Sequence, residues 1–156
     1  YVSLDELYKN SDIISLHCPL NNDTKYIVNS NSISKMKDGA MIINTGRGKL
    51  INTIDLIEGL KSKKIGAAGL DVYEEEADYF FEDHSTEILD DDVLARLLTF
   101  NNVIVTSHQA FFTKEALSNI AETTLKSVSE LESAKKLSYE IAYVCENGNC
   151  SPKDIK

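Results

Sequence analysis

Four short apolar runs divide the first two thirds of the chain, at residues 13–16, 40–43, 67–72 and 103–105. Each run has the length of a β-strand and is bordered by Gly, Asn, Asp or Pro, which are common at strand ends. Polar residues do not alternate with apolar ones inside the runs, a pattern typical of strands that are covered on both faces. We therefore predict four buried strands.

Three segments beside these runs read as helices. Two of them place apolar residues three apart, between residues suited to capping a helix. Strands that alternate with helices favour parallel strands with right-handed crossovers, and hence a doubly wound α/β layer. The segments are residues 1–10, then 30–39 with Ile33, Met36 and the cap Gly39, and then 52–66 with Ile54, Ile57, Leu60 and the N-cap Asn52 or Thr53.

The clearest helical pattern follows the last run, at residues 113–136, where apolar residues form one stripe and Thr113 is a suitable N-cap. Beyond residue 136 the periodicity ends, and the turn-forming composition predicts a poorly ordered tail. The predicted organisation is one domain over 1–112, a helix over 113–135 and a tail over 136–156. The stripe consists of Leu117, Ile120, Ala121, Leu125, Val128 and Leu131.

Length and charge narrow the class of protein. A chain of 156 residues with 42% hydrophobic and 26% charged residues suffices for one globular domain. Its formal net charge of −9 argues against binding to nucleic acid or an anionic membrane, since both need clustered Lys and Arg. No apolar run approaches the roughly 20 residues that cross a bilayer, and the first residues do not form a signal peptide. We expect a cytoplasmic protein.

The acidic and cysteine-containing segments have simple interpretations. The acid-rich segment 74–92 contains three aromatic residues and is interpreted as a solvated loop that they anchor. The three cysteines, Cys18, Cys145 and Cys150, are an odd number, which suggests a reducing compartment without a disulfide framework. The C-x4-C spacing of the last two could hold a metal ion, but no further Cys or His lies near them. We therefore predict no metal site.

Polar residues follow the apolar runs at the point where each strand ends. Ligands of open parallel sheets bind beyond these ends, so Arg47, Glu76 and His108 are candidates for one site. Each alone has a simpler explanation, as a surface turn residue, a solvated acid and a structural histidine, respectively. Together, an acid beside an imidazole supports proton transfer near neutral pH. An arginine offers a planar fork for a substrate carboxylate.

Four motifs, in this order and spacing, resemble the NAD-dependent D-2-hydroxyacid dehydrogenases. They are "ISLHCPL", "MIINTGRGKLI", "GLDVYEEE" and "SHQAFFTKEAL". The acid-rich insertion "DYFFEDHSTEILDDDVLARL" and the "HQAF" after it resemble the D-lactate dehydrogenase branch in particular. The resemblance covers about residues 1–131 and implies a reversible transfer of hydride between NADH and pyruvate or D-lactate.

The resemblance assigns three catalytic residues. Arg47 matches the family arginine that holds the substrate carboxylate, and His108 matches the general acid/base. Glu76 matches the glutamate that pairs with that histidine, whereas its neighbours Glu74 and Glu75 are expected to point elsewhere.

The resemblance also implies contacts to NAD. Asp71 matches the aspartate beside the nicotinamide carboxamide, and Gly46 stands where the family usually has Ser or Ala. Thr24 stands where relatives often have Asn near the cofactor, so it is not included. The implied cofactor-binding residues are Cys18, Pro19, Thr45, Gly46, Arg47 and Asp71.

The fold implied by the resemblance is a partial Rossmann-type sheet. Its first strands, its G-x-G-x-x-G turn and a substrate domain are not among these residues, and the sequence starts without Met. We therefore expect a fragment of a larger enzyme, with 1–112 as a partial NAD-binding domain and 113–135 as the helix that returns toward the substrate domain. The expected partners are a small 2-keto or 2-hydroxy acid and, in the full-length enzyme, a second copy as a homodimer. The alternative is a non-catalytic NAD-binding or protein-interaction module of the same family, similar to its co-repressors.

Overall fold

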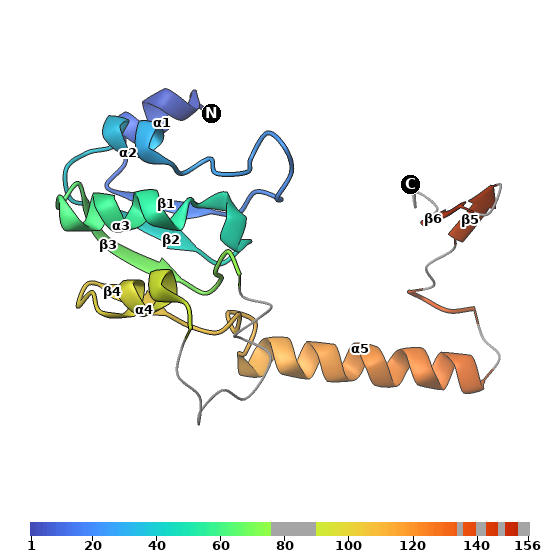
Figure 1. Cartoon of the computed structure of the whole chain (residues 1–156). Helices are drawn as coiled ribbons and strands as arrows, with labels where there is room; N and C mark the ends of the chain where they lie inside the picture. The colour runs from blue at the N-terminus through green and yellow to red at the C-terminus, as the bar shows by residue number, and fades with distance from the viewer. Residues whose placement is uncertain (76–89, 134–135, 140–142, 147–148, 153–156) are drawn as a thin grey trace. The chain divides into compact units, whose positions relative to one another are not determined.

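The computed structural model describes residues 1–75, 90–133, 136–139, 143–146 and 149–152. These residues form two compact units, Tyr1–Ala110 and Phe111–Lys156 (Figure 1). The division lies close to the boundary expected after residue 112. Most of the acid-rich segment, including Tyr79, Phe80 and Phe81, lies outside the described residues.

The first unit contains a parallel four-stranded sheet, and all four predicted strands form. They pair in the order β1-β2-β3-β4 (Figure 1). The register aligns the last residues of the strands, because Leu16 pairs with Asn44, Asn44 with Leu70, and Leu70 with Val105. The strands are β1 (Ile13–Leu16), β2 (Ala40–Asn44), β3 (Ile65–Leu70) and β4 (Val103–Val105).

The helices of this unit begin where a side chain caps the first turn. Asn52 accepts a hydrogen bond from the Asp55 backbone N–H and so starts α3 at the residue after it. Helix α4 was not predicted; Asp91 caps the N–H groups of Val93 and Leu94 at its start. The helices are α1 (Leu4–Asn10), α2 (Ser30–Lys35), α3 (Thr53–Lys61) and α4 (Asp92–Leu98), with the short 3₁₀ turn η1 at Gly48–Leu50.

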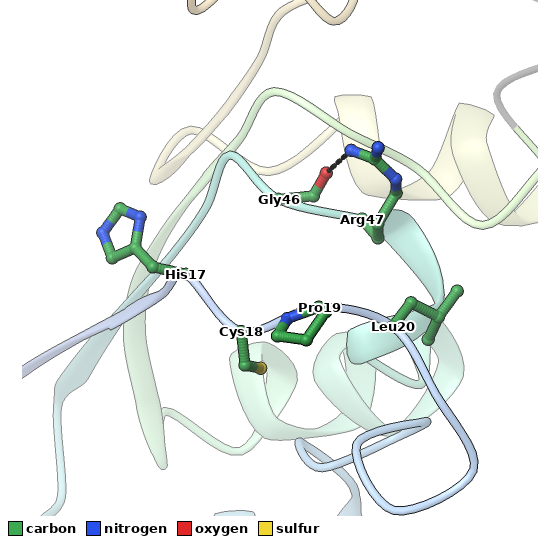
Figure 2. A pocket seen from close by; sticks show the side chains of 6 residues that line it. All are labelled: His17, Cys18, Pro19, Leu20, Gly46 and Arg47. Carbon is green, nitrogen blue, oxygen red and sulfur yellow. Dashed lines mark hydrogen bonds between the residues drawn. The ribbon is translucent and has the colours of Figure 1, made fainter. Parts of the chain in front are cut away.

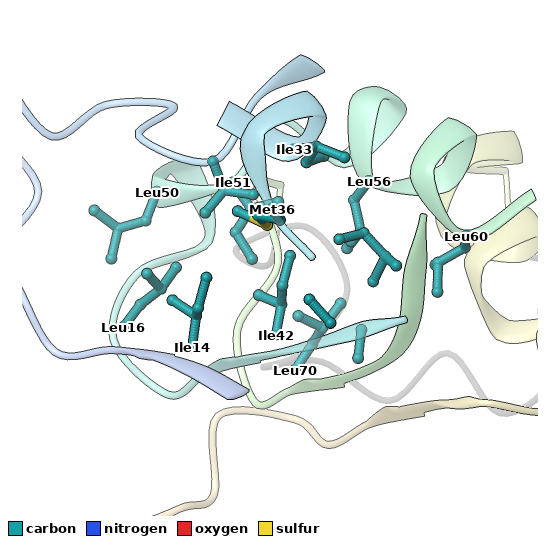
Figure 3. Packing of buried hydrophobic residues seen from close by; sticks show 14 of the residues in the cluster. Ile14, Leu16, Ile33, Met36, Ile42, Leu50, Ile51, Leu56, Leu60 and Leu70 are labelled. Carbon is teal, nitrogen blue, oxygen red and sulfur yellow. The ribbon is translucent and has the colours of Figure 1, made fainter. Parts of the chain in front are cut away.

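The core lies between one face of the sheet and these helices (Figure 3). The predicted apolar face of α3 was partly wrong, because Ile54 is 62% exposed. The buried positions 53, 56, 57 and 60 follow the i, i+3, i+4, i+7 spacing of one helix face, which excludes position 54. The core residues labelled in Figure 3 are Ile14, Leu16, Ile33, Met36, Ile42, Leu50, Ile51, Leu56, Leu60 and Leu70.

The opposite face of the sheet differs from the prediction of strands covered on both sides. Along β1 the residues alternate between exposed and buried, and Ile13 is 59% exposed. On β4, Ile104 is 70% exposed. The apolar runs show that both faces of the sheet carry apolar side chains. Among the described residues, however, helices cover only one of these faces.

The second unit contains a helix and a hairpin. Helix α5 (Lys114–Glu132) is capped by Thr113, as predicted. Strands β5 (Tyr143–Glu146) and β6 (Asn149–Pro152) pair antiparallel, in contrast to the predicted tail. The sequence between them is Asn-Gly, the dipeptide with the strongest preference for two-residue hairpin loops. None of the described helices is long and apolar enough to cross a membrane.

Gly48 is a position where the packing leaves no room for a side chain. A Cβ atom there would lie 1.9 Å from the Tyr73 carbonyl oxygen and 2.6 Å from the Glu74 backbone nitrogen. At Gly46, two residues earlier, a Cβ atom would approach its nearest neighbours only to 3.4 Å, an ordinary contact distance. The backbone after β2 therefore lies directly against the backbone after β3.

We expect Gly48→Ala to lower the free energy of unfolding by roughly 1–3 kcal/mol or more, because two backbone segments must separate. Gly46→Ala is the matched control and should change it by less than about 1 kcal/mol. Urea unfolding of both variants measures the difference. Equal losses in the two variants would contradict the close approach at Gly48.

Candidate active site

The loops that follow the four strands meet at one edge of the sheet. The aligned strand ends place Cys18, Arg47, Asp71 and His108 within three residues of that edge. This is the edge at which parallel sheets bind ligands. Arg47 and His108 therefore lie at the edge of the sheet at which they were expected, whereas Glu76 lies outside the described residues.

The loop after β2 is shaped by a buried asparagine. Asn44 is only 1% exposed, its Nδ2 donates to the Arg47 carbonyl oxygen at 2.9 Å, and its Oδ1 accepts from the Gly46 N–H at 3.0 Å. The Arg47 Nη1 donates to the Gly46 carbonyl oxygen at 2.8 Å. The asparagine thus fixes the backbone of this loop, while the arginine side chain stays exposed.

A cleft of about 620 Å³ opens beside Arg47. Figure 2 shows Gly46 and Arg47 on one side of it, with Pro19 and Leu20 on the other. Its volume is within the range of small-molecule sites, and its lining combines apolar groups with one cation, so these residues fit part of a dinucleotide. The lining residues are His17, Cys18, Pro19, Leu20, Gly46 and Arg47.

The loop after β4 is held by the carboxylate of Asp71, which follows β3. The Thr106 hydroxyl and the Gln109 N–H donate to Oδ1, the latter at 2.8 Å, and the Ala110 N–H donates to Oδ2 at 2.7 Å. The Asp71 carbonyl oxygen accepts from the His108 N–H at 2.7 Å. One aspartate therefore binds a side chain before His108, the backbone of His108 itself and the backbone of the two residues after it.

His108 occupies the left-handed region, with φ of 53°. Such a conformation costs of order 1–3 kcal/mol for a residue other than Gly, and it persists only where the surroundings impose it. The hydrogen bonds to Asp71 impose it here. The imidazole is therefore attached to a backbone whose geometry is set by the neighbouring strand.

The ionisation of Asp71 reflects these contacts. Burial alone would raise the pKa of its carboxyl group, which belongs to a residue that is 5% exposed. The three hydrogen bonds and the nearby charge of His108 outweigh burial and lower the pKa below its ordinary value. The carboxylate is thus ionised, and remains a hydrogen-bond acceptor, at neutral pH.

The acidic turn after β3 separates into residues with different roles. Glu74 accepts hydrogen bonds from the Tyr26 hydroxyl and the Thr53 N–H, and Glu75 forms a 3.4 Å ion pair with Lys49. Both acids therefore point to structural partners, as expected. Glu76 lies outside the described residues, so its pairing with the histidine stays a prediction.

The predicted site residues fall into two groups in the structure. Cys18, Pro19, Gly46 and Arg47 line the cleft, and Thr45 is exposed beside them. Asp71 and His108 form the second group at the same edge; that both groups contact one substrate stays a prediction. Four residues that support these loops were not predicted from the sequence: Asn44, Thr106, Tyr26 and Glu74. Asn44 could have been recognised, because it is a polar residue at the end of a buried strand.

Within the described part of the chain, no three His, Cys, Asp or Glu side chains are grouped so that they could hold a metal ion. The chemistry that this edge offers is therefore that of a cation, an imidazole and hydrogen-bonding backbone beside a cleft.

Known proteins match this chain along most of its length. The D-lactate dehydrogenase of Escherichia coli (strain K12) is 48% identical over 141 residues, which are 90% of this chain and 43% of that protein. An aromatic 2-oxoacid reductase of Clostridium sporogenes is 52% identical over 132 residues, 85% of this chain and 40% of that protein. The crystal structure of D-lactate dehydrogenase with NAD+ from Lactobacillus jensenii matches with a TM-score of 0.81 at 35% identity, over 91% of this chain and 43% of that one.

The chain therefore spans about two fifths of the length of these relatives. The profile of the D-isomer specific 2-hydroxyacid dehydrogenase, NAD-binding domain, matches residues 1–110, which form the first compact unit. The partial Rossmann-type fold and the NAD cofactor expected from the motifs are confirmed. The chain belongs to the D-isomer specific 2-hydroxyacid dehydrogenase family, and its first unit is part of the NAD-binding domain of that family.

Proposed function

We propose that a protein containing this chain catalyses the reversible reduction of pyruvate to D-lactate with NADH. The observation that carries the proposal is the shared sheet edge, where Arg47 borders a cleft and His108 is held in a left-handed conformation by Asp71. Strained backbone conformations cluster at active sites, so the strain at His108 supports a catalytic role for this residue. The names of the E. coli and L. jensenii relatives support D-lactate as the hydroxy acid.

Each residue has one role in this reaction. The Arg47 guanidinium binds the substrate carboxylate with two parallel N–H donors and so orients the keto carbon. The His108 imidazole gives a proton to the keto oxygen during reduction and takes it back from the hydroxyl during oxidation. Glu76 would keep that imidazole protonated, as the resemblance implies.

When bound, the cofactor would supply the hydride as NADH and accept it in the reverse direction as NAD+. Cys18, Pro19 and Gly46 would contact the cofactor along the cleft. Asp71 supports the reaction by holding the histidine loop, and a contact to the nicotinamide carboxamide remains part of the proposal for this residue.

We expect His108→Gln to lower the rate of pyruvate reduction by about 10²–10⁴-fold in the complete protein, because the general acid is lost. Steady-state assays of NADH oxidation measure this. NADH binding, followed by fluorescence, should stay within about threefold of wild type, since the imidazole acts on the substrate. An unchanged rate would remove His108 from catalysis. NADH binding without turnover in the wild type would instead favour a non-catalytic module.

Arg47→Lys keeps a positive charge but loses the planar fork. We expect kcat/KM for pyruvate to fall by about ten- to a hundredfold, as for the loss of one charge-assisted hydrogen bond. Arg47→Gln should reduce it further, because the charge is also lost. Steady-state kinetics over a range of pyruvate concentrations measure kcat/KM for wild type and both variants. A lysine variant with the kcat/KM of wild type would contradict this role of Arg47.

Asp71→Asn should destabilise the fold most at neutral pH. Because the pKa of this carboxyl is lowered in the folded state, its contribution to stability is complete above the unfolded value of about 3.9 and is lost as the pH falls through the lower folded value. The difference in unfolding free energy between wild type and variant should therefore shrink below about pH 4. Urea unfolding from pH 7 to pH 3 measures it, and a constant difference would refute this linkage.

A further inference from the structure

We infer that Glu74 is a positioning residue, which fixes the loop of Arg47 against the turn after β3 that also holds the loop of His108. The catalytic role of Glu74 rests on the proposed function, but its contacts can be tested without an activity assay. The carboxylate of Glu74 is half-buried and lies between two segments distant in sequence.

Both carboxylate oxygens of Glu74 are used. Oε1 accepts a hydrogen bond from the Thr53 N–H at 2.6 Å, at the start of α3, and Oε2 accepts one from the Tyr26 hydroxyl at 2.9 Å. Hydrogen bonds to an ionised acceptor are roughly twice as strong as those between neutral groups. A negative charge at the first turn of a helix is also stabilising.

The two donors belong to segments that are joined to the loop of Arg47. The Tyr26 N–H donates to the Lys49 carbonyl oxygen at 2.9 Å, and the Val28 N–H donates to the Leu50 carbonyl oxygen at 3.1 Å. Tyr26 has φ of 53°, so its backbone is held in a conformation that an unconstrained tyrosine rarely adopts. The segment around Tyr26 therefore runs alongside the residues directly after Arg47, and Glu74 joins both to the acidic turn.

Gly48 lies where the loop of Arg47 contacts the turn after β3. A side chain there would overlap the Tyr73 carbonyl oxygen and the Glu74 nitrogen, so the two backbone segments lie in direct contact. Arg47 directly precedes this contact, and Asp71, which holds the loop of His108, lies two residues before Tyr73 on the same turn. The bonds of Glu74 thus help to set the spacing between the loop of Arg47 and the loop of His108.

Glu75 provides a matched comparison on the same turn. Its contact to the loop is an ion pair with Lys49 at 3.4 Å, in which the side chains are 40% and 55% exposed. Ion pairs exposed to this extent contribute little to structure. Glu75→Ala therefore changes charge and side-chain size as Glu74→Ala does, but removes only this weak contact to the loop.

The test combines spectroscopy on the full chain with kinetics on the complete protein. In amide NMR spectra, Glu74→Ala should shift the resonances of Arg47, Gly48 and Thr53, and Glu75→Ala should leave them near their wild-type positions. Tyr26→Phe removes one hydroxyl and should shift Arg47 and Gly48 in the same direction, which preserves the test if the alanine variant does not fold.

In the kinetic arm, Glu74→Ala should raise the KM for pyruvate and lower kcat, with a combined loss in kcat/KM of about ten- to a hundredfold, as expected for a small misplacement of a binding group. The dissociation constant for NADH should change by less than about twofold, because Glu74→Ala leaves the contacts that support the cleft residues before Gly46 in place. Glu74→Gln keeps an acceptor for Thr53 and a polar group for Tyr26, so it should restore most of the activity, with a loss of no more than about threefold.

The outcomes separate the two claims. If the Arg47 and Gly48 resonances stay in place in both Glu74→Ala and Tyr26→Phe, the inference is overturned whether or not the protein is a dehydrogenase. If Glu74→Ala loses no more activity than Glu75→Ala, the positioning role is also overturned. If the wild type does not reduce any 2-keto acid, the proposed function fails, and the spectra still decide whether Glu74 sets the loop.

Discussion

The carboxylate of Asp71 is the interaction on which the geometry of the site depends. It accepts a side-chain and two backbone hydrogen bonds from the loop after β4, and its own carbonyl oxygen binds the backbone of His108. A buried carboxylate is costly unless such donors surround it, and here the donors outweigh the cost, as the lowered pKa indicates. The charge of Asp71, its burial and the conformation of the loop of His108 therefore depend on one another.

The short turn after β3 connects the two halves of the candidate site. At its start, Asp71 holds the loop of the histidine, and three residues later Glu74 binds Tyr26 and the first turn of α3. The close contact at Gly48 adds a steric link to the loop of the arginine. Two catalytic groups on different strands can thus keep a constant spacing because a single rigid turn contacts both of their loops.

The strands and their common edge could be predicted because their signals are local. Apolar runs of strand length with Gly, Asn or Pro at the ends specify buried parallel strands, and polar residues after them mark the ligand-binding edge. The face of α3 was less predictable, since Ile54 and Leu56 are both apolar and only packing against the sheet selects Leu56. Helix α4 was missed because its acidic cap, Asp91, is also typical of a solvated loop.

The sequence by itself determined the class of fold and the order of the four strands, because these follow from residue type and spacing, and the resemblance of its motifs indicated the family and the candidate catalytic residues. Only the tertiary structure decided which acids of the turn support the fold, how His108 is strained, and that Asn44 shapes the loop of Arg47. These features depend on hydrogen bonds between segments far apart in the chain. No local pattern encodes such bonds, since their partners come together only when the sheet forms.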